Sequence, residues 1–361
     1  NEDGRARFIA TGSALTADQP DARHPFRLIS GRLRDQWHGM SRTGRVPRLF
    51  AHEPEPCLQL NPADLARRGW ASGTLMSVSN RRGTIVLPLA GSDEVRPGQA
   101  FVAMHWGRHS LSHDGVNALT PPAFDPVSKQ PELKHTAVRI EPAALPWRMT
   151  VLRSAGGSAD ANEQVLAWRA RLQTVLGEFN ELGDSGFAAL TLDGRDRPLV
   201  ALRLAAAAPL PDAQIEALAR MLDMPAAICL NYRDGARHIV KRAIVEAGRL
   251  TGILLAGEDQ ASGWLRTALR DGVAIDDLRR WLFAPRSTPP LAAGEAMEAM
   301  TSRRVICNCF NVSSEEIARE IAAGAAGTAL ADVQAKLKCG TSCGSCLTEI
   351  RRMMMALPSD G

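Results

Sequence analysis

The sequence predicts a multidomain chain with a mainly β N-terminal domain, a small α+β middle domain and a small helical C-terminal domain. Residues 1–146 are rich in Pro and Gly and carry short apolar alternations, which is typical of strands joined by turns. Residues 147–286 change to long Ala, Leu and Arg stretches with helical spacing. Five of the seven cysteines lie within the last 55 residues. We therefore expect a linker at 287–302 and a separate cysteine domain at 303–361.

The composition excludes several classes of protein. With 361 residues, 45% of them hydrophobic and 23% charged, the chain can bury more than one core. A net charge of +4 is too small to indicate nucleic-acid binding by itself. No apolar run approaches the roughly 18 to 20 residues of a membrane helix. We expect a soluble, cytoplasmic protein without nucleic-acid or membrane partners, and a start within a longer protein, because residues 1–8 contain no initiating Met and no leader.

Local patterns predict the first elements of the N-terminal domain. Two apolar runs, at 75–79 and 84–89, are joined by a turn-forming segment and predict a β-hairpin. A further strand is expected at 100–104, after a Pro-Gly turn. A short helix is expected over 62–67, because Asn61 suits the N-cap and a proline follows at the first helical position.

The middle domain alternates helices with strands. Helical spacing of apolar residues predicts helices over 165–175 and 215–222. A hairpin is expected from 237–245 and 250–255. No glycine-rich dinucleotide fingerprint follows a strand, so we assign no NAD or FAD to this domain. The segment 232–242 with its hairpin resembles a domain of nitrite reductases and related pyridine-nucleotide reductases, and we expect a scaffold or docking role.

The cysteine spacing at the C-terminus indicates a metal site. Cys307 and Cys309 form one close pair, and Cys343 and Cys346 form a second pair 33 residues later, with Cys339 just ahead of it. A two-iron cluster needs four thiolates around two tetrahedral irons, which two close pairs can supply. Spacing alone leaves open a structural zinc site with four cysteines, and also disulfides.

Short helices are expected between and after the two cysteine pairs. Ser313 and Glu316 fit a capping box at the start of the first helix. Thr328 is expected to cap a second helix over 329–338, and a third is expected from about Gly344. Backbone N–H groups at that third helix start can stabilise thiolates. The apolar faces of these helices are small, so a bound cluster is expected to contribute to the stability of the domain.

The residues around the cysteines resemble a known domain. The segments 305–312 and 338–347 resemble the [2Fe-2S] domain of the bacterioferritin-associated ferredoxin type. This resemblance covers roughly residues 303–357 and implies that Cys339 is an extra thiol, free or beside the ligands. It also implies a [2Fe-2S] cluster with four protein ligands: Cys307, Cys309, Cys343 and Cys346.

A strongly basic segment lies near the N-terminus. Between Arg23 and Arg48 there are seven arginines and one acid, Asp35, a net charge of about +6. Arginine guanidinium groups suit pairs of phosphate oxygens. Gly31 follows the strand-like run 26–29 and would let backbone amides approach a pyrophosphate. Charge alone leaves open a solvated basic face or an RNA-binding strip.

The order of residues in this segment resembles a cofactor-binding family. Residues 30–43 resemble the segment that grips a guanine dinucleotide in the C-terminal domain of molybdopterin oxidoreductases, in particular assimilatory nitrate reductases. The segments 116–120, 125–128 and 132–135 follow in that family's order, and the similarity spans about residues 20–142. The resemblance implies a double-psi β-barrel. It also implies the following cofactor contacts, the last two as weaker candidates: Gly31, Arg32, Trp37, His38, Thr43, Asn117, Lys134, His105 and Trp106.

Together the two resemblances imply the C-terminal part of a bacterial assimilatory nitrate reductase, which reduces nitrate to nitrite. Electrons would enter from a flavoprotein or a ferredoxin and pass through the [2Fe-2S] cluster to a molybdenum-bis(molybdopterin guanine dinucleotide) cofactor, whose site is only partial here. The domains that bind molybdenum and a [4Fe-4S] cluster are expected in a missing N-terminal part, because Cys57 and Cys229 are isolated. Cys57 is expected to be a small buried strand residue. We predict no catalytic residue in this chain, which alone should not reduce nitrate.

Two other functions remain open from the sequence. The first is another molybdopterin oxidoreductase, such as a formate dehydrogenase, because the residues near the metal set the substrate and the barrel does not. The second is a stand-alone iron–sulfur electron-transfer module whose barrel binds nothing. A guanine-dinucleotide pterin in the extracted cofactor would separate the first from the second.

Overall fold

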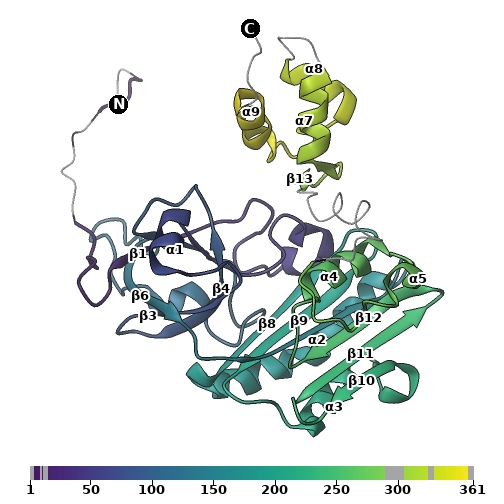
Figure 1. Ribbon diagram of the computed structural model, residues 1–361. Helices are drawn as coiled ribbons and strands as arrows, with labels where there is room; N and C mark the ends of the chain where they lie inside the picture. Colours follow the sequence, from purple (N-terminus) through teal and green to yellow (C-terminus); the bar gives the residue numbers. More distant parts are fainter. Residues whose placement is uncertain (1–3, 9, 11–14, 289–304, 324–328, 357–361) are drawn as a thin grey trace.

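The computed structural model describes residues 4–8, 10, 15–288, 305–323 and 329–356. Its three folded parts are a barrel, a six-stranded sheet with helices, and a small helical domain (Figure 1). The predicted linker at 287–302 lies outside the described residues from 289 onward. Within the described part, none of the helices has the length and apolar character that crossing a bilayer requires.

Six strands close the barrel in the order β1-β5-β2-β4-β3-β6, with β6 pairing back to β1. Strands β1 and β5 run parallel, as do β2 and β4, and the other neighbours are antiparallel. The elements of this part are β1 (Phe26–Gly31), η1 (Thr43–Arg45), η2 (Pro47–Phe50), β2 (Leu58–Leu60), α1 (Pro62–Arg68), β3 (Leu75–Ser79), β4 (Thr84–Gly91), β5 (Gln99–Ala103), η3 (Gly115–Leu119) and β6 (Thr136–Pro142).

The local predictions for this part are confirmed. The hairpin is β3 with β4, and the strand after the Pro-Gly turn is β5. Helix α1 begins where its cap predicts, because the Asn61 side chain accepts a hydrogen bond from the Ala63 N–H. It ends at Gly69, whose φ of 66° lies in the left-handed region that favours glycine. The mainly β character of the N-terminal domain follows from these elements.

The second part is an antiparallel sheet in the order β10-β11-β12-β7-β9-β8. Helices α2 and α3 cover one face and α4 covers the other (Figure 1). The predicted helices and hairpin are confirmed as α2, α3 and β11–β12. The elements are β7 (Trp147–Ser154), α2 (Ala161–Glu181), η4 (Gly183–Ser185), β8 (Gly186–Asp193), β9 (Leu199–Ala206), α3 (Asp212–Met221), η5 (Ala226–Ile228), β10 (Leu230–Asp234), β11 (Ile239–Glu246), β12 (Arg249–Ala256), α4 (Ser262–Asp271) and α5 (Ile275–Leu278).

The barrel and the sheet share one hydrophobic core, which includes buried side chains from both. Backbone hydrogen bonds also join them: Ser112 N–H donates to the Ala188 carbonyl at 2.9 Å, and Leu190 N–H donates to the Ser110 carbonyl at 2.8 Å. Because apolar packing and backbone pairing both cross this boundary, we treat the two parts as one rigid support for the loops described below.

The C-terminal part is a small helical domain around a two-stranded sheet. Its core contains Ile306, Ile317, Val333 and Ile350, all buried. The predicted capping box is confirmed, since Ser313 Oγ accepts the N–H of Glu316, whose carboxylate accepts the Ser313 N–H. The elements are β13 (Val305–Cys307), β14 (Val312–Ser313), α7 (Ser314–Ala323), α8 (Leu330–Leu337) and α9 (Leu347–Ala356).

Two predicted helix starts in this domain need correction. Helix α8 begins at Leu330 with Ala329 as its N-cap, and Thr328 lies outside the described residues. Asp332 accepts the Ala329 N–H at 2.9 Å, so a carboxylate in the first turn stabilises this end. Helix α9 begins at Leu347, not near Gly344, because Gly344 has φ 71° and cannot continue a right-handed helix.

Candidate functional site

Two tight turns present the cysteines. Cys307 ends β13, and Cys309 lies in the turn that leads to β14. The second pair lies between α8 and α9, in a turn where Gly340 has φ 79° and Gly344 has φ 71°. A Cβ at position 340 would lie 2.5 Å from the Leu347 side chain. The turn therefore requires glycine there, both for its backbone conformation and for space.

The four predicted ligands lie as two thiol pairs. Cys309 Sγ is 3.2 Å from Cys343 Sγ, and the Cys346 thiol hydrogen-bonds the Cys307 side chain. Cys309 and Cys343 are exposed, whereas the other pair is buried. Within the described part of the chain, no three His, Cys, Asp or Glu side chains converge on one point that could hold a metal ion. Two thiol pairs are the donor set of a two-iron cluster, in which each iron takes two thiolates, so the residues fit this group.

The exposed cysteine pair has polar neighbours, whereas the buried pair lies in an apolar environment. Hydrogen bonds from the Ser345 hydroxyl and backbone N–H lower the pKa of the Cys343 thiol. Burial and the neighbouring Cys307 raise the pKa of Cys346 to about 12. Cys339 is 0% exposed, and burial followed by Cys307 raises its pKa. The extra thiol thus lies in the core of the domain beside the buried pair.

The two isolated cysteines lie elsewhere. Cys57 is half-buried and precedes β2, so the prediction of a buried strand residue is wrong in both position and burial. Its Sγ lies 3.5 Å from the Glu53 carboxylate, and burial followed by this negative charge raises its pKa. Cys229 is half-buried in the second part of the structure, and burial raises its pKa. Neither thiol lies among the four predicted ligands.

The second candidate site lies at one end of the barrel. Strands β1 and β5 are parallel and end together, with Gly31 paired to Ala103. The Met104 N–H donates to the Gly31 carbonyl at 2.9 Å. Parallel strands bring the loops that follow them to the same edge. These two loops carry all but one of the predicted cofactor contacts: Arg32, Trp37, His38, Thr43, His105, Trp106, Asn117 and Lys134. Gly31 is the last residue of β1 itself.

Lys134 lies at the end of the loop that follows β5. It precedes β6, which is antiparallel to β1 and therefore begins where β1 ends. The Ser30 hydroxyl donates to the Leu133 carbonyl at 2.6 Å and fixes this approach. The side chains of Lys134 and Asn117 are exposed, so both can reach a ligand on the surface.

Gly31 is close to Phe101, since a Cβ at Gly31 would lie 2.7 Å from that ring.

Four of the predicted contacts cluster on the loop after β1. The guanidinium of Arg32 lies 5.7 Å from the ring centre of Trp37, which is 53% exposed. The Trp37 and His38 rings meet edge to face at 4.4 Å. The Trp37 N–H donates to Thr43 Oγ1 at 3.2 Å. A cation and an exposed indole side by side suit a ligand that carries both phosphates and a planar base.

His105 and Trp106 are buried behind this loop. His105 Nε2 accepts the Leu33 N–H at 2.9 Å, and its Nδ1 donates to the His38 carbonyl. Burial lowers the pKa of His105, and the nearby Arg32 lowers it further. A neutral imidazole that contacts both Leu33 and His38 positions the first part of this loop. Trp106 is 2% exposed and packs near Phe50, so both residues support the loop from within.

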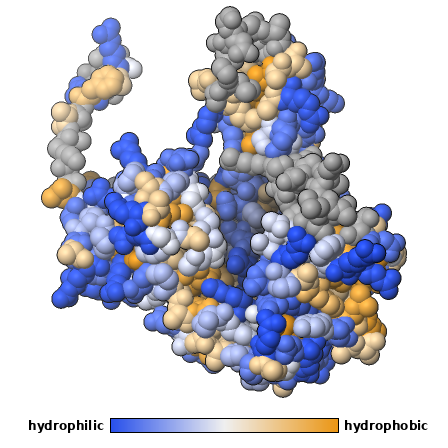
Figure 2. Space-filling model, in the orientation of Figure 1, coloured by the Kyte–Doolittle hydropathy of each residue, from blue (hydrophilic) through white to orange (hydrophobic). Residues whose placement is uncertain are grey.

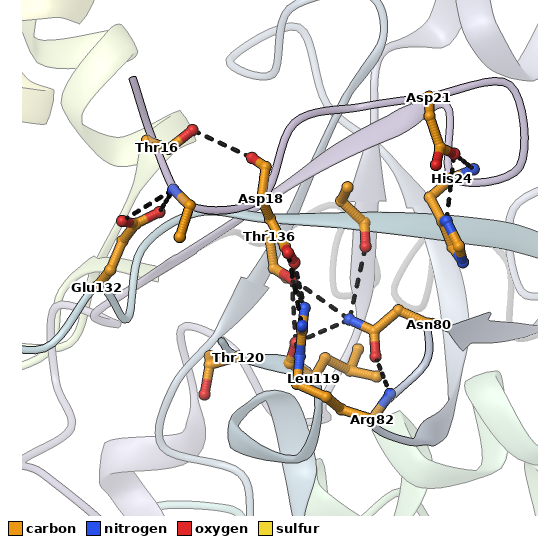
Figure 3. Close-up of polar contacts among 12 residues, drawn as sticks. Thr16, Asp18, Asp21, His24, Asn80, Arg82, Leu119, Thr120, Glu132 and Thr136 are labelled. Atoms are coloured by element: carbon orange, nitrogen blue, oxygen red, sulfur yellow. Dashed lines mark hydrogen bonds and ion pairs between the residues drawn. The ribbon is translucent and has the colours of Figure 1, made fainter. Parts of the chain in front are cut away.

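A polar network fixes the loop that carries Asn117 (Figure 3). The Leu119 carbonyl accepts hydrogen bonds from Asn80 at 2.8 Å, Arg82 at 2.9 Å and Thr136 at 3.0 Å. The Thr136 hydroxyl proton is shared between the Leu119 carbonyl and the Asp18 carboxylate, which pairs with Arg82. Sequence reasoning missed this network, because its members come from four separate segments and no local pattern marks them.

Helix α2 supports the basic segment from the other side. Arg169 Nη1 donates to the Gly44 carbonyl at 2.6 Å, and Nη2 donates to the His109 carbonyl at 3.1 Å. A pocket of about 330 Å³ lies here and is lined by Arg45 and Arg169 among others. The middle part of the chain thus holds the loops that follow β1 and β5 in place.

The two candidate sites face each other across one cleft. A cavity of about 790 Å³ separates the barrel from the cysteine domain. Arg32 and Arg34 line it on the barrel side, and Ser345, Glu349 and Arg352 line it on the other. Figure 2 shows a recessed, mostly hydrophilic surface in the region where the three parts meet. The cavity therefore lies between the basic segment and the domain that carries the four thiols.

Comparison with known families assigns the two domains that carry these sites. Residues 26–137 match the molybdopterin dinucleotide binding domain. Residues 305–356 match the BFD-like [2Fe-2S] binding domain. The chain therefore contains a molybdopterin dinucleotide-binding domain and a BFD-like [2Fe-2S] domain. The barrel with its carboxyl-end loops belongs to the first domain, and the two thiol pairs belong to the second, which confirms both predicted cofactors.

Relatives match these domains and the region between them. A nitrate reductase of Klebsiella oxytoca is 30% identical over 99% of this chain and 37% of its own length. A nitrate reductase of Synechocystis is 38% identical over 39% of this chain and 20% of its own length. A periplasmic nitrate reductase of Desulfovibrio desulfuricans is 37% identical over 39% of this chain and 18% of its own length. The chain thus spans little more than a third of the relative that it matches from end to end.

Proposed function

We propose that this chain is the C-terminal part of a nitrate reductase, a molybdenum oxidoreductase. It would bind the dinucleotide of the molybdenum cofactor and relay electrons through its [2Fe-2S] cluster. One observation supports this most strongly: the Klebsiella oxytoca nitrate reductase matches 99% of the chain, including the middle domain that neither family covers. The cluster supplies one-electron transfer, and the protein supplies its ligands and its position.

The finer assignments are also proposals. We infer the assimilatory type, which reduces nitrate to nitrite in the cytoplasm, with a flavoprotein or a ferredoxin as electron donor. The cofactor would be molybdenum-bis(molybdopterin guanine dinucleotide), held only in part by this chain. The remaining domains would supply the molybdenum ligand and a [4Fe-4S] cluster.

We also infer the domain limits 1–146, 147–286 and 303–361. The change from the barrel to the sheet between β6 and β7 supports the first limit. The parallel pairs β1–β5 and β2–β4 within an otherwise antiparallel barrel support the double-psi assignment. The middle domain would serve as a scaffold, and the hydrogen bonds of Arg169 to the barrel loops support that role.

The proposed residue roles follow from position and chemistry. Arg32 and Lys134 would bind phosphate oxygens, because both are exposed cations at the carboxyl end of β1. Trp37 would stack on a planar ring, and Asn117 would hydrogen-bond to the ligand. Gly31 would let the ligand approach the backbone, while His105 would hold the loop without touching the ligand.

A test of this function uses the native protein that contains the chain. With reduced viologen as electron source, we expect nitrite to form from nitrate. We also expect a guanine-dinucleotide pterin in the cofactor extract analysed by mass spectrometry. Oxidation of formate without nitrate reduction would contradict the substrate assignment. An extract without any pterin would instead favour a stand-alone electron-transfer module.

A further inference from the structure

The loop between the first two cysteine ligands touches the barrel directly. Asn308, which separates Cys307 from Cys309, donates from its side-chain amide to the Asp35 carboxylate at 3.1 Å. Asp35 is the one acid in the basic segment from Arg23 to Arg48. The contact therefore joins the loop of the [2Fe-2S] domain to the segment that we assign to the dinucleotide.

Asp35 is well buried at this boundary, with only 8% of its side chain exposed. A carboxylate in such a place is costly unless it is paired and hydrogen-bonded. Arg34 lies 3.4 Å from Asp35, and its other terminal nitrogen donates to Glu349 on α9 at 3.0 Å. Arg34 thus bridges the barrel and the helix that follows the second cysteine pair.

An arginine from the second part of the structure also holds Asn308. Arg195 donates from Nη1 to the Asn308 carbonyl at 2.9 Å. It lies in the turn between β8 and β9, where Gly194 has φ 84° and a Cβ would lie 2.3 Å from the Arg197 carbonyl oxygen. Only glycine fits this turn. Asp193, the residue before it, accepts a hydrogen bond from Arg266 Nε at 2.7 Å, which anchors the turn to α4. The Asn308 loop is therefore held by both the barrel and the sheet.

We propose that Asp35 and Asn308 form the docking contact that holds the cluster loop against the dinucleotide segment. Asp35 thereby positions the loop, and its negative charge lowers the reduction potential of the cluster. This inference rests on the proposed electron relay. A fixed contact keeps the distance between the two cofactors constant. A negative charge beside the loop opposes the uptake of an electron, because charges and hydrogen bonds near a cluster set its potential.

The test is a reductive titration of the purified, cluster-loaded chain, followed by electron paramagnetic resonance. Each cluster takes up one electron from dithionite. At the midpoint potential of the unmodified chain, Asp35→Asn should shift the ratio of reduced to oxidised cluster upward by roughly threefold to tenfold. An unchanged ratio would overturn the role of the Asp35 charge.

Two further variants separate charge from structure. Asp35→Asn combined with Asn308→Asp restores a donor–acceptor pair but moves the negative charge into the cluster loop, so the ratio should fall below that of the unmodified chain. Arg352→Ala is the matched control, because it removes a pair with Glu94 at 2.5 Å across the same cleft, where both side chains are largely exposed. A shift of the control equal to that of Asp35→Asn would point to general loosening and would overturn the proposal.

The contact itself is measured in the unmodified chain, so the proposal does not depend on variants that fold. The reduced cluster is paramagnetic and should broaden the amide NMR signal of Leu33, which adjoins Arg34. Arg195→Ala removes the hydrogen bond to the Asn308 carbonyl without substituting a residue of either contacting loop, and it should weaken this broadening. Absence of broadening in the unmodified chain would refute the docking contact alone, whereas a chain without any cluster would refute the proposed relay.

Discussion

At the scale of single residues, the chemistry of each site depends on a few side chains held in place by backbone contacts. His105 is the clearest case, because it carries no ligand and yet holds both Leu33 and His38. As a buried neutral imidazole with a lowered pKa, it contributes stability above its ordinary pKa of about 6.5. That contribution is lost as the pH falls through the lowered value.

Replacement of His105 by Phe should loosen the loop after β1. The change leaves the half-buried Leu33 N–H and the His38 carbonyl without their partner, at a cost of about 1 kcal/mol. Hydrogen exchange of the Leu33 amide should accelerate by roughly tenfold or more. The exposed His109 provides the control, and His109→Gln should leave that rate unchanged. Equal protection of Leu33 in both variants would contradict the role of His105.

At the scale of elements, a partly buried ion network joins the barrel to the sheet. Glu55, before β2, pairs with Arg203 on β9 and with Arg266 on α4. Burial opposes the charge of Glu55, but the two arginines outweigh it and hold its pKa below its ordinary value of 4.5. This carboxylate therefore stabilises the fold above about pH 4.5, and the contribution is lost as the pH falls through the lowered pKa.

Glu55→Gln should lower the free energy of unfolding by about 2 kcal/mol at neutral pH, because it leaves two partly buried arginines with less compensation. Urea denaturation followed by fluorescence measures the difference. The gap between the variant and the unmodified chain should shrink as the pH falls below about 4.5. Glu141→Gln, which removes an exposed partner of Arg139, should cost less than about 1 kcal/mol. A gap independent of pH would contradict the ionised state of Glu55.

Some of these elements could be predicted from sequence and others could not. The Ser313–Glu316 cap and the β3–β4 hairpin follow from residues a few positions apart, so local patterns reveal them. The Thr136–Asp18 hydrogen bond spans 118 positions and the Arg266–Glu55 pair spans 211, and no local pattern indicates such partners. The start of α9 was predicted too early because a glycine suits both a helix start and a left-handed turn, and only the backbone angle decides.

At the scale of the whole molecule, the three parts differ in how much core supports them. The barrel and the sheet share one large core, whereas the cysteine domain has a small core that includes three of its own cysteines. A domain of this size gains much of its stability from a bound metal group. Removal of iron should therefore destabilise the cysteine domain more than the barrel and the sheet.

Removal of iron by a chelator under reducing conditions should unfold the cysteine domain and leave the rest folded. Amides of Ile317 and Ile350 should lose at least tenfold of their protection against hydrogen exchange, whereas the Leu202 amide in β9 should keep its protection. Equal protection at Ile317 and Ile350 before and after iron removal would show that the helices need no cluster.

The proposed electron relay depends on the four thiols, because they are the predicted ligands of the cluster. The most direct measurement is iron and acid-labile sulfide per chain, together with the spectrum of the dithionite-reduced protein in electron paramagnetic resonance. We predict two irons and two sulfides per chain and a spin-½ signal. Serine at Cys307, Cys309, Cys343 or Cys346 should abolish or alter that signal, and Cys339→Ser should preserve the iron content. A colourless protein with one zinc per chain, or four serine variants with unaltered spectra, would contradict the account.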